Sequence, residues 1–221
     1  MQRYRPLLII VIVAAVTVGA LACLLRSQQG VESRVSPVTP QPGTEAQKKI
    51  PDGVVVTLEE FGDYQCPPCG ALHPSLKKLK LEFGSNLNFV FRNFPLTTIH
   101  KNALAAAQAA EAARMQNRFW EMHDLLYENQ ELWKDDINPK SIFEKFAADL
   151  GLDTARFSRD MDDKQVKLRI EADQSAAAEL GIEGTPTLLI DGRQLRPEAM
   201  TPEGIRKGIE FVLSHKAPSP S

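Results

Sequence analysis

Two cysteines separated by two prolines, Cys66 and Cys69, lie where a strand-like segment gives way to a helix-like one. Residues 53–61 are apolar and β-branched and too few for a buried helix, so they predict a central strand covered on both faces. A helix is expected from Cys66 onward, because apolar side chains recur on one helical face at Leu72, Leu76, Leu79 and Phe83. Residues 86–96 predict the next strand. This order predicts a βαβ unit with parallel strands and a right-handed crossover.

The rest of the chain predicts a helical block followed by a β-hairpin and a last helix. Residues 99–180 have helical propensity and spacing and contain no convincing strand. Residues 185–195 hold an Asp-Gly turn between apolar segments, which is typical of a hairpin. Thr201 and Pro202 begin the closing helix as N-cap and first helical residue. With 221 residues, 43% of them hydrophobic, the chain is expected to form one α/β domain with a helical insertion.

An apolar run without charge occupies residues 7–25. As a helix it would be about 28 Å long, which is close to the ~30 Å hydrocarbon core of a bilayer. Arg3 and Arg5 precede the run and favour a cytoplasmic N-terminus, which sends the rest of the chain outside. We therefore expect an extracytoplasmic domain, in the periplasm or at the cell surface, that contacts the membrane through this segment.

Three fates of residues 1–26 stay open. The segment is an uncleaved signal anchor, or a signal peptide cut behind Ala20-Leu21-Ala22, which would secrete the domain. The third fate is a lipoprotein acylated at Cys23. Residues 27–49 contain three prolines, two glycines and no apolar periodicity, so they predict a flexible linker. Residues 216–221 predict a disordered tail.

The charge of the chain argues against nucleic acid as a partner. There are 26 basic and 28 acidic residues, giving a formal net charge of -2, and the basic residues form no cluster beyond short pairs. Nucleic-acid-binding domains carry a basic patch or stripe. We therefore expect no nucleic-acid partner.

The Cys66 and Cys69 pair has three interpretations. A structural disulfide across so short a loop constrains the unfolded chain much less than a long loop would. A zinc site needs about four nitrogen or sulfur ligands, yet there is no second C-x-x-C motif; His73 lies one turn beyond Cys69 and the other histidines are scattered. A pair that cycles between dithiol and disulfide accounts for the position and spacing of the two cysteines better than either of these.

The position of the pair at a predicted helix start favours this redox chemistry. A thiolate there meets the positive end of the helix dipole and unpaired backbone N–H groups, both of which stabilise the charged form. Cys66, at the expected N-cap, is therefore the candidate nucleophile. Cys69 is one turn deeper and less exposed, and it is placed to attack a mixed disulfide and release the product.

With these features the chain resembles the thioredoxin superfamily and, within it, the DsbA-like thiol-disulfide oxidoreductases. The motifs are a strand leading into "CPPC", Pro74 five residues after Cys69, and "GTPT" opening a late strand. The inserted helices single out the DsbA-like branch. The resemblance implies a thioredoxin-like fold for a domain at 50–215, with the helical subdomain at about 99–180. It also implies no metal and no cofactor beyond the redox-active disulfide itself.

The resemblance implies a substrate-binding role for Thr185 and Pro186. Pro186 is expected to be a cis-proline that faces the two sulfurs, and Thr185 to offer backbone groups to an extended substrate. Without the resemblance, a trans bond is the default for any X-Pro pair.

Glu60 falls where the family keeps a buried acid under the active site. By strand alternation it shares a face with Val54, Val56 and Leu58. A buried Glu60 would have a raised pKa and could shuttle a proton for Cys69. The alternatives are a solvated charge at the strand end, or Glu59 in this place if the register differs by one.

Pro67 and Pro68, between the cysteines, are expected to tune the reduction potential. The strong oxidants of the family carry a histidine where this chain has Pro68. Proline brings no positive charge and no N–H for the Cys66 thiolate, which leaves the Cys69 N–H as the nearest donor. We therefore expect a weaker oxidant than members with a potential of about −120 mV.

The function implied by the resemblance is disulfide exchange with exported, cysteine-containing proteins, with the chain acting as an oxidase. Reoxidation would then need a quinone-linked membrane partner, either DsbB-like or vitamin K epoxide reductase-like. Two rivals stay open. One is a reductase or isomerase in the same compartment, and the other is a copper or zinc carrier that uses the cysteine pair.

Overall fold

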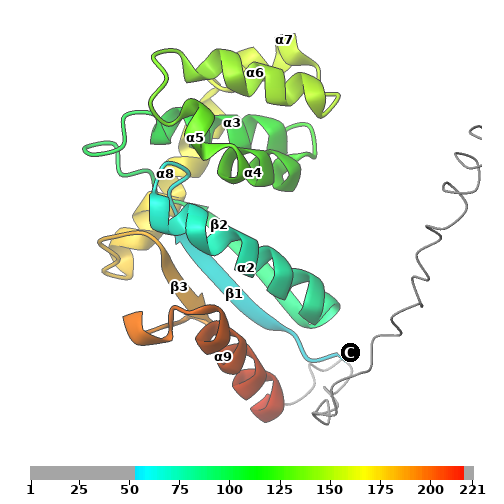
Figure 1. Cartoon of the computed structure of the whole chain (residues 1–221), viewed down its shortest axis with the longest axis vertical. Coiled ribbons are helices and arrows are strands. Elements are labelled where there is room, and N and C mark those ends of the chain that lie inside the picture. Colours follow the sequence, from blue (N-terminus) through cyan, green and yellow to red (C-terminus); the bar gives the residue numbers. More distant parts are fainter. Residues whose placement is uncertain (1–52, 217–221) are drawn as a thin grey trace, which may run out of the picture. The chain divides into compact units, whose positions relative to one another are not determined.

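A computed structural model describes residues 53–216, and a four-stranded sheet forms the centre of this region (Figure 1). Its strands lie in the order β2-β1-β3-β4. As predicted, β1 and β2 are parallel, and β3 and β4 form an antiparallel hairpin that joins β1. β1 begins three residues later than the apolar run. The strands are β1 (Val56–Gly62), β2 (Leu87–Asn93), β3 (Thr187–Ile190) and β4 (Arg193–Gln194).

The turn of the hairpin is made by Asp191 and Gly192, which both have positive φ, 46° and 75°. Aspartate is among the residues found most often with positive φ, and glycine has no Cβ to clash. The Asp191 carboxylate also accepts a hydrogen bond from the Thr57 backbone N–H at 2.9 Å. The turn is thereby fastened to β1.

Helices α2 (Pro67–Phe83) and α9 (Pro202–His215) cover one face of the sheet. The leucine stripe of α2 packs with the apolar side chains of β1 and with Ile205, Ile209 and Leu213 of α9. The Thr201 hydroxyl caps α9 by accepting from the Gly204 N–H, as the sequence predicted. Pro74 lies inside α2 and removes one backbone donor there.

Six helices follow β2, which confirms the predicted helical insertion, and most of them gather at one end of the sheet (Figure 1). Their core contains Trp133, Phe143 and Phe157, and it also contains both cysteines. The last of the six packs against the other face of the sheet through Ala177. The helices are α3 (Ala103–Arg114), α4 (Phe119–Glu128), α5 (Gln130–Trp133), α6 (Pro139–Asp149), α7 (Thr154–Asp160) and α8 (Lys164–Glu179).

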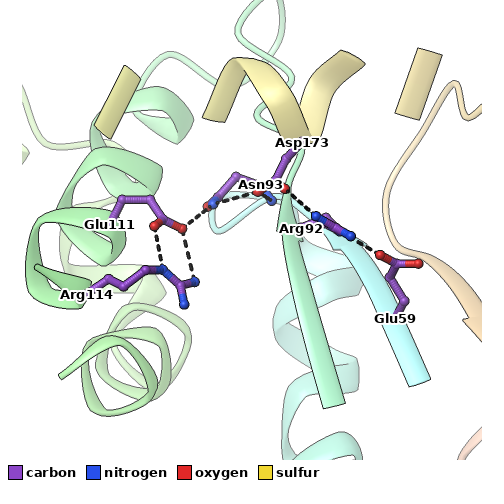
Figure 2. A network of polar contacts seen from close by, with 6 residues as sticks. All are labelled: Glu59, Arg92, Asn93, Glu111, Arg114 and Asp173. Carbon is purple, nitrogen blue, oxygen red and sulfur yellow. Dashed lines mark hydrogen bonds and ion pairs between the residues drawn. The ribbon is translucent and has the colours of Figure 1, made fainter. Parts of the chain in front are cut away.

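A buried polar network joins the sheet to the inserted helices (Figure 2). Arg92 of β2 donates to Glu59 of β1 at 2.6 Å and to Asp173 of α8 at 3.2 Å. The next residue, Asn93, donates to Asp173 and to Glu111 of α3. Because each buried carboxylate has a partner, the network fixes the insertion on the sheet without leaving an unpaired charge.

The remaining predictions concern the two ends of the chain, which the structure describes only in part. Lys216 does not belong to a disordered tail, because its ammonium contacts the Val55 carbonyl at 2.7 Å and the Asp191 carboxylate at 2.8 Å. Within residues 53–216, no helix is long and apolar enough to cross a bilayer. The predicted membrane segment at 7–25, Cys23, the linker at 27–49 and residues 217–221 lie outside the described region.

Candidate active site

Cys66 and Cys69 lie at the N-terminal end of α2, where the sequence placed them. Cys66 is the N-cap, with extended backbone angles, and its carbonyl accepts the first helical hydrogen bond from Gly70 at 3.1 Å. Cys66 is 4% exposed and Cys69 is fully buried. The nucleophile candidate is therefore less open to solvent than the sequence indicated, although it is still the more accessible of the two. No disulfide bond joins the two sulfurs in this structure.

The surroundings of the two sulfurs move their pKa values in opposite directions. Hydrogen bonds from the Cys69 thiol and the Cys69 backbone N–H to the Cys66 sulfur lower the Cys66 pKa to about 6, against the opposing effect of burial. Burial raises the pKa of Cys69 well above its ordinary value, and the hydrogen bond to Cys66 adds to this. At pH 7 the reduced pair therefore holds one thiolate, on Cys66, and one thiol, on Cys69.

Thr185 and Pro186 face Cys66 from the loop before β3. The Thr185–Pro186 peptide bond is cis, as the resemblance implied. The Cys66 sulfur lies 3.5 Å from the Thr185 carbonyl oxygen. An apolar groove of about 460 Å³ begins here, lined by Pro68, Leu72, Pro186, Met200 and Pro202. It gives an extended chain a place to lie beside the reactive sulfur.

Glu60 lies on β1 under the cysteine pair and is only 1% exposed. Burial raises its pKa to about 8, and the Cys66 thiolate contributes to the rise. Its Oε1 atom has no hydrogen-bond partner within the described part of the chain. Glu59 is the wrong candidate, because it points to the opposite face and pairs with Arg92. A protonated Glu60 can give its proton to a Cys69 thiolate.

Other residues, which the sequence did not reveal, fix the loop that carries Cys66. The Gln130 side-chain amide, from α5, donates to the Tyr64 carbonyl at 2.7 Å and to the Cys66 carbonyl at 3.1 Å. The buried Asp63 accepts from the Gln65 N–H and contacts His100 Nδ1 at 2.7 Å. Gln130 lies 64 residues from Cys66, and no pattern in the sequence connects the two.

The prolines between the cysteines are exposed at the start of α2. Neither has an N–H, so the Cys69 backbone N–H is the donor that reaches Cys66 from the helix, as expected. Within residues 53–216, Cys66 and Cys69 belong to no cluster of three or more metal-binding side chains. This arrangement favours sulfur chemistry at the pair over a metal centre.

Comparison with known proteins identifies the family of the chain. A family model described as Thioredoxin matches residues 54–210. The chain belongs to this thioredoxin family. A thioredoxin-like oxidoreductase from Silicibacter pomeroyi has a similar structure, with a TM-score of 0.62 and 25% identity, over 75% of this chain and 90% of that one. The oxidoreductase DsbA from Xylella fastidiosa shares the fold, with a TM-score of 0.61 and 20% identity, over 75% and 92%.

The chain thus combines a domain of the thioredoxin family, a DsbA-like fold and a cysteine pair at the start of a helix. A curated relative of this chain is a protein of Salinispora tropica named Na(+)/H(+) antiporter NhaA 3, with 36% identity over 171 residues. The match covers 77% of this chain and 25% of the relative, so the chain spans about a quarter of the curated relatives it matches. The antiporter name describes those longer proteins, and no antiport activity is assigned to this chain.

Proposed function

We propose that this chain is a thiol-disulfide oxidoreductase that works outside the cytoplasm as an oxidase of exported, cysteine-containing proteins. The observation that carries the proposal is the lowered pKa of Cys66 beside a buried Cys69. A stable Cys66 thiolate stabilises the reduced pair, and a pair with a stable reduced form readily takes electrons from substrate thiols. The basic residues Arg3 and Arg5, which precede the apolar run at residues 7–25, support the extracytoplasmic location.

The reaction begins with the oxidised pair. A substrate thiolate attacks Sγ of Cys66, the Cys66–Cys69 bond breaks, and Cys69 leaves as a thiolate that takes a proton from Glu60. The substrate is now bound to Cys66 by a mixed disulfide. A second substrate thiolate attacks the substrate sulfur of that bond, and Cys66 leaves as a stable thiolate. The substrate has lost two electrons, and the pair has gained them.

The loop at Thr185 and the apolar groove support binding of an unfolded substrate. A chain that lies extended beside Thr185 can pair with its backbone groups, as a strand pairs with a sheet edge. Apolar side chains of the substrate can enter the groove, which has a largely apolar lining. Binding of this kind depends on the backbone and the apolar side chains of the substrate, and it therefore suits many different exported proteins. A quinone-linked membrane protein, DsbB-like or vitamin K epoxide reductase-like, would then reoxidise the pair.

The test is the stoichiometry of oxidation. We expect one equivalent of the oxidised full chain to remove two thiols from a reduced, unfolded protein with several cysteines, measured by thiol titration and by mass spectrometry of both proteins. The Cys66→Ser variant, which cannot hold the disulfide, is the control and should remove none. If the substrate keeps its thiols while the reduced chain opens substrate disulfides instead, the chain is a reductase and the proposal is wrong.

A further inference from the structure

A second group of reactive side chains lies away from the cysteine pair. His73 of α2 and His123 and Asp124 of α4 line a cavity of about 160 Å³ together with Trp120 and two lysines. One ring nitrogen of each histidine and one carboxylate oxygen of Asp124 all lie within 4.8 Å of one another. The two histidines are 50 positions apart in the sequence and look unrelated there. The fold brings them into contact, with ring centroids 5.2 Å apart.

The spacing of these atoms is close to that of a metal-ligand set. Zinc bonds to nitrogen and oxygen are about 2.0–2.1 Å long, so neighbouring ligands in a tetrahedral site lie about 3.4 Å apart. The distance from His73 Nε2 to Asp124 Oδ1 is already 3.5 Å. Asp124 is 31% exposed, so its side chain has room to adjust toward the two imidazoles.

The buried Nε2 atom of His73 lies 3.5 Å from Asp124 Oδ1 but makes no hydrogen bond with it. His73 is 5% exposed, and its Nε2 atom has no hydrogen-bond partner among the described residues. Buried polar atoms in folded proteins nearly always have a partner, so an unpaired one that borders a cavity indicates a ligand.

His123 has the outer partner that metal-binding histidines usually have. Its Nδ1 atom is hydrogen-bonded to the Tyr64 hydroxyl at 3.0 Å. A bond of this kind orients the ring and leaves the other nitrogen, Nε2, for a metal. His123 Nε2 makes no hydrogen bond with any residue between 53 and 216.

We propose that His73, His123 and Asp124 bind one divalent transition-metal ion of the Zn²⁺ class. Two imidazoles and one carboxylate suit borderline cations such as Zn²⁺ and exclude Ca²⁺ and Mg²⁺, which prefer oxygen ligands. The cavity leaves the fourth position to water. The site is separate from the cysteine pair, and it binds metal when that pair is a disulfide.

Lys77 opposes binding of a metal ion at this site. A variant at Lys77 should therefore have the opposite effect on metal affinity from a variant that removes a ligand. Its ammonium lies 2.7 Å from Asp124 Oδ2 and 2.8 Å from Glu128 Oε1. The positive charge both repels a cation and occupies the carboxylate that the cation needs. Removing the charge with Lys77→Gln should therefore strengthen metal binding, whereas removal of a ligand should weaken it.

The experiment measures Zn²⁺ binding to the oxidised full chain by competition with a chromophoric chelator. All proteins carry Cys23→Ser, so no thiolate is present to bind zinc. We expect one equivalent to bind, with an affinity at least tenfold weaker in Asp124→Asn and tenfold stronger in Lys77→Gln. The matched control is His215→Ala, because His215 is exposed on α9; it should bind like the parent protein.

Variants at His73 are less suitable alone, because this buried residue could be needed for folding. Asp124→Asn is conservative and partly exposed, so its effect reports binding and not folding. Equal binding by Asp124→Asn and the parent, or the absence of stoichiometric binding in the parent, would overturn the proposal. So would a loss of binding in His215→Ala, since the zinc would then lie elsewhere.

Discussion

A Cys69→Ser variant is expected to remain covalently joined to its substrate, whereas a Cys66→Ser variant forms no such complex. Cys66 is the accessible sulfur with the lowered pKa, and Cys69 is fully buried behind it. When the substrate has a single reactive sulfur, Cys69 is the thiol that can open the mixed disulfide at Cys66, so the complex persists in its absence. Without Cys66, the exchange rate should fall by about a thousandfold or more, as for other enzymes that lose their nucleophile.

The measurement is a non-reducing gel of each variant after reaction with a thiol-reactive mixed-disulfide substrate, with mass spectrometry of the joined species. Ser175→Ala is a suitable control, because Ser175 is exposed on α8 and does not line the groove. This variant should turn over like the parent protein. Complexes that form through Cys69 in the Cys66→Ser variant would contradict the assignment of the two sulfurs.

The second large effect is expected on stability. Replacing Glu60 with glutamine should stabilise the reduced protein more at pH 8 than at pH 5, by about 3 kcal/mol. Glu60 has a pKa of about 8 in the folded chain and an ordinary value of 4.5. Between these values the folded state holds a proton that the unfolded state has released. The wild-type free energy of unfolding therefore falls as the pH rises through this window, and the glutamine variant lacks that loss.

Urea unfolding of both proteins at pH 5, 6.5 and 8 measures the difference. The titration of Cys66 is common to the two proteins, so it largely cancels in the comparison. Glu210→Gln removes an exposed carboxylate from α9 and serves as the control for loss of charge. A stability difference that stays constant from pH 5 to pH 8 would show that Glu60 is not a buried acid with a raised pKa.

Much of the active site could be predicted because its parts are encoded locally. The position of Cys66 follows from a strand and a helix that meet at it, and two prolines mark the start of that helix. Glu60 could be placed under the pair because strand alternation sends it to the same face as Leu58, which is fully buried. Its neighbour Glu59 has the same chemistry, and only the register separates the two.

The residues that the sequence did not reveal depend on contacts made by the insertion. Gln130 supports the Cys66 loop from α5, and His123 reaches His73 from α4. The packing of helices on one another determines these contacts. The periodicity of a sequence indicates which face of a helix is buried, but it does not indicate which other helix that face contacts. His73 and His123 are therefore scattered along the sequence, although the fold makes them adjacent.

The reduction potential of the Cys66–Cys69 pair tests the oxidase proposal most directly. The full chain with Cys23→Ser would be equilibrated with glutathione buffers, and the oxidised fraction would be measured at each ratio. We expect a value more oxidising than about −180 mV but below the −120 mV of the strongest oxidants, because Cys66 is a stable thiolate while Pro68 gives it no charge or N–H. A value near −270 mV would make the protein a reductant and would contradict the proposed direction of electron flow.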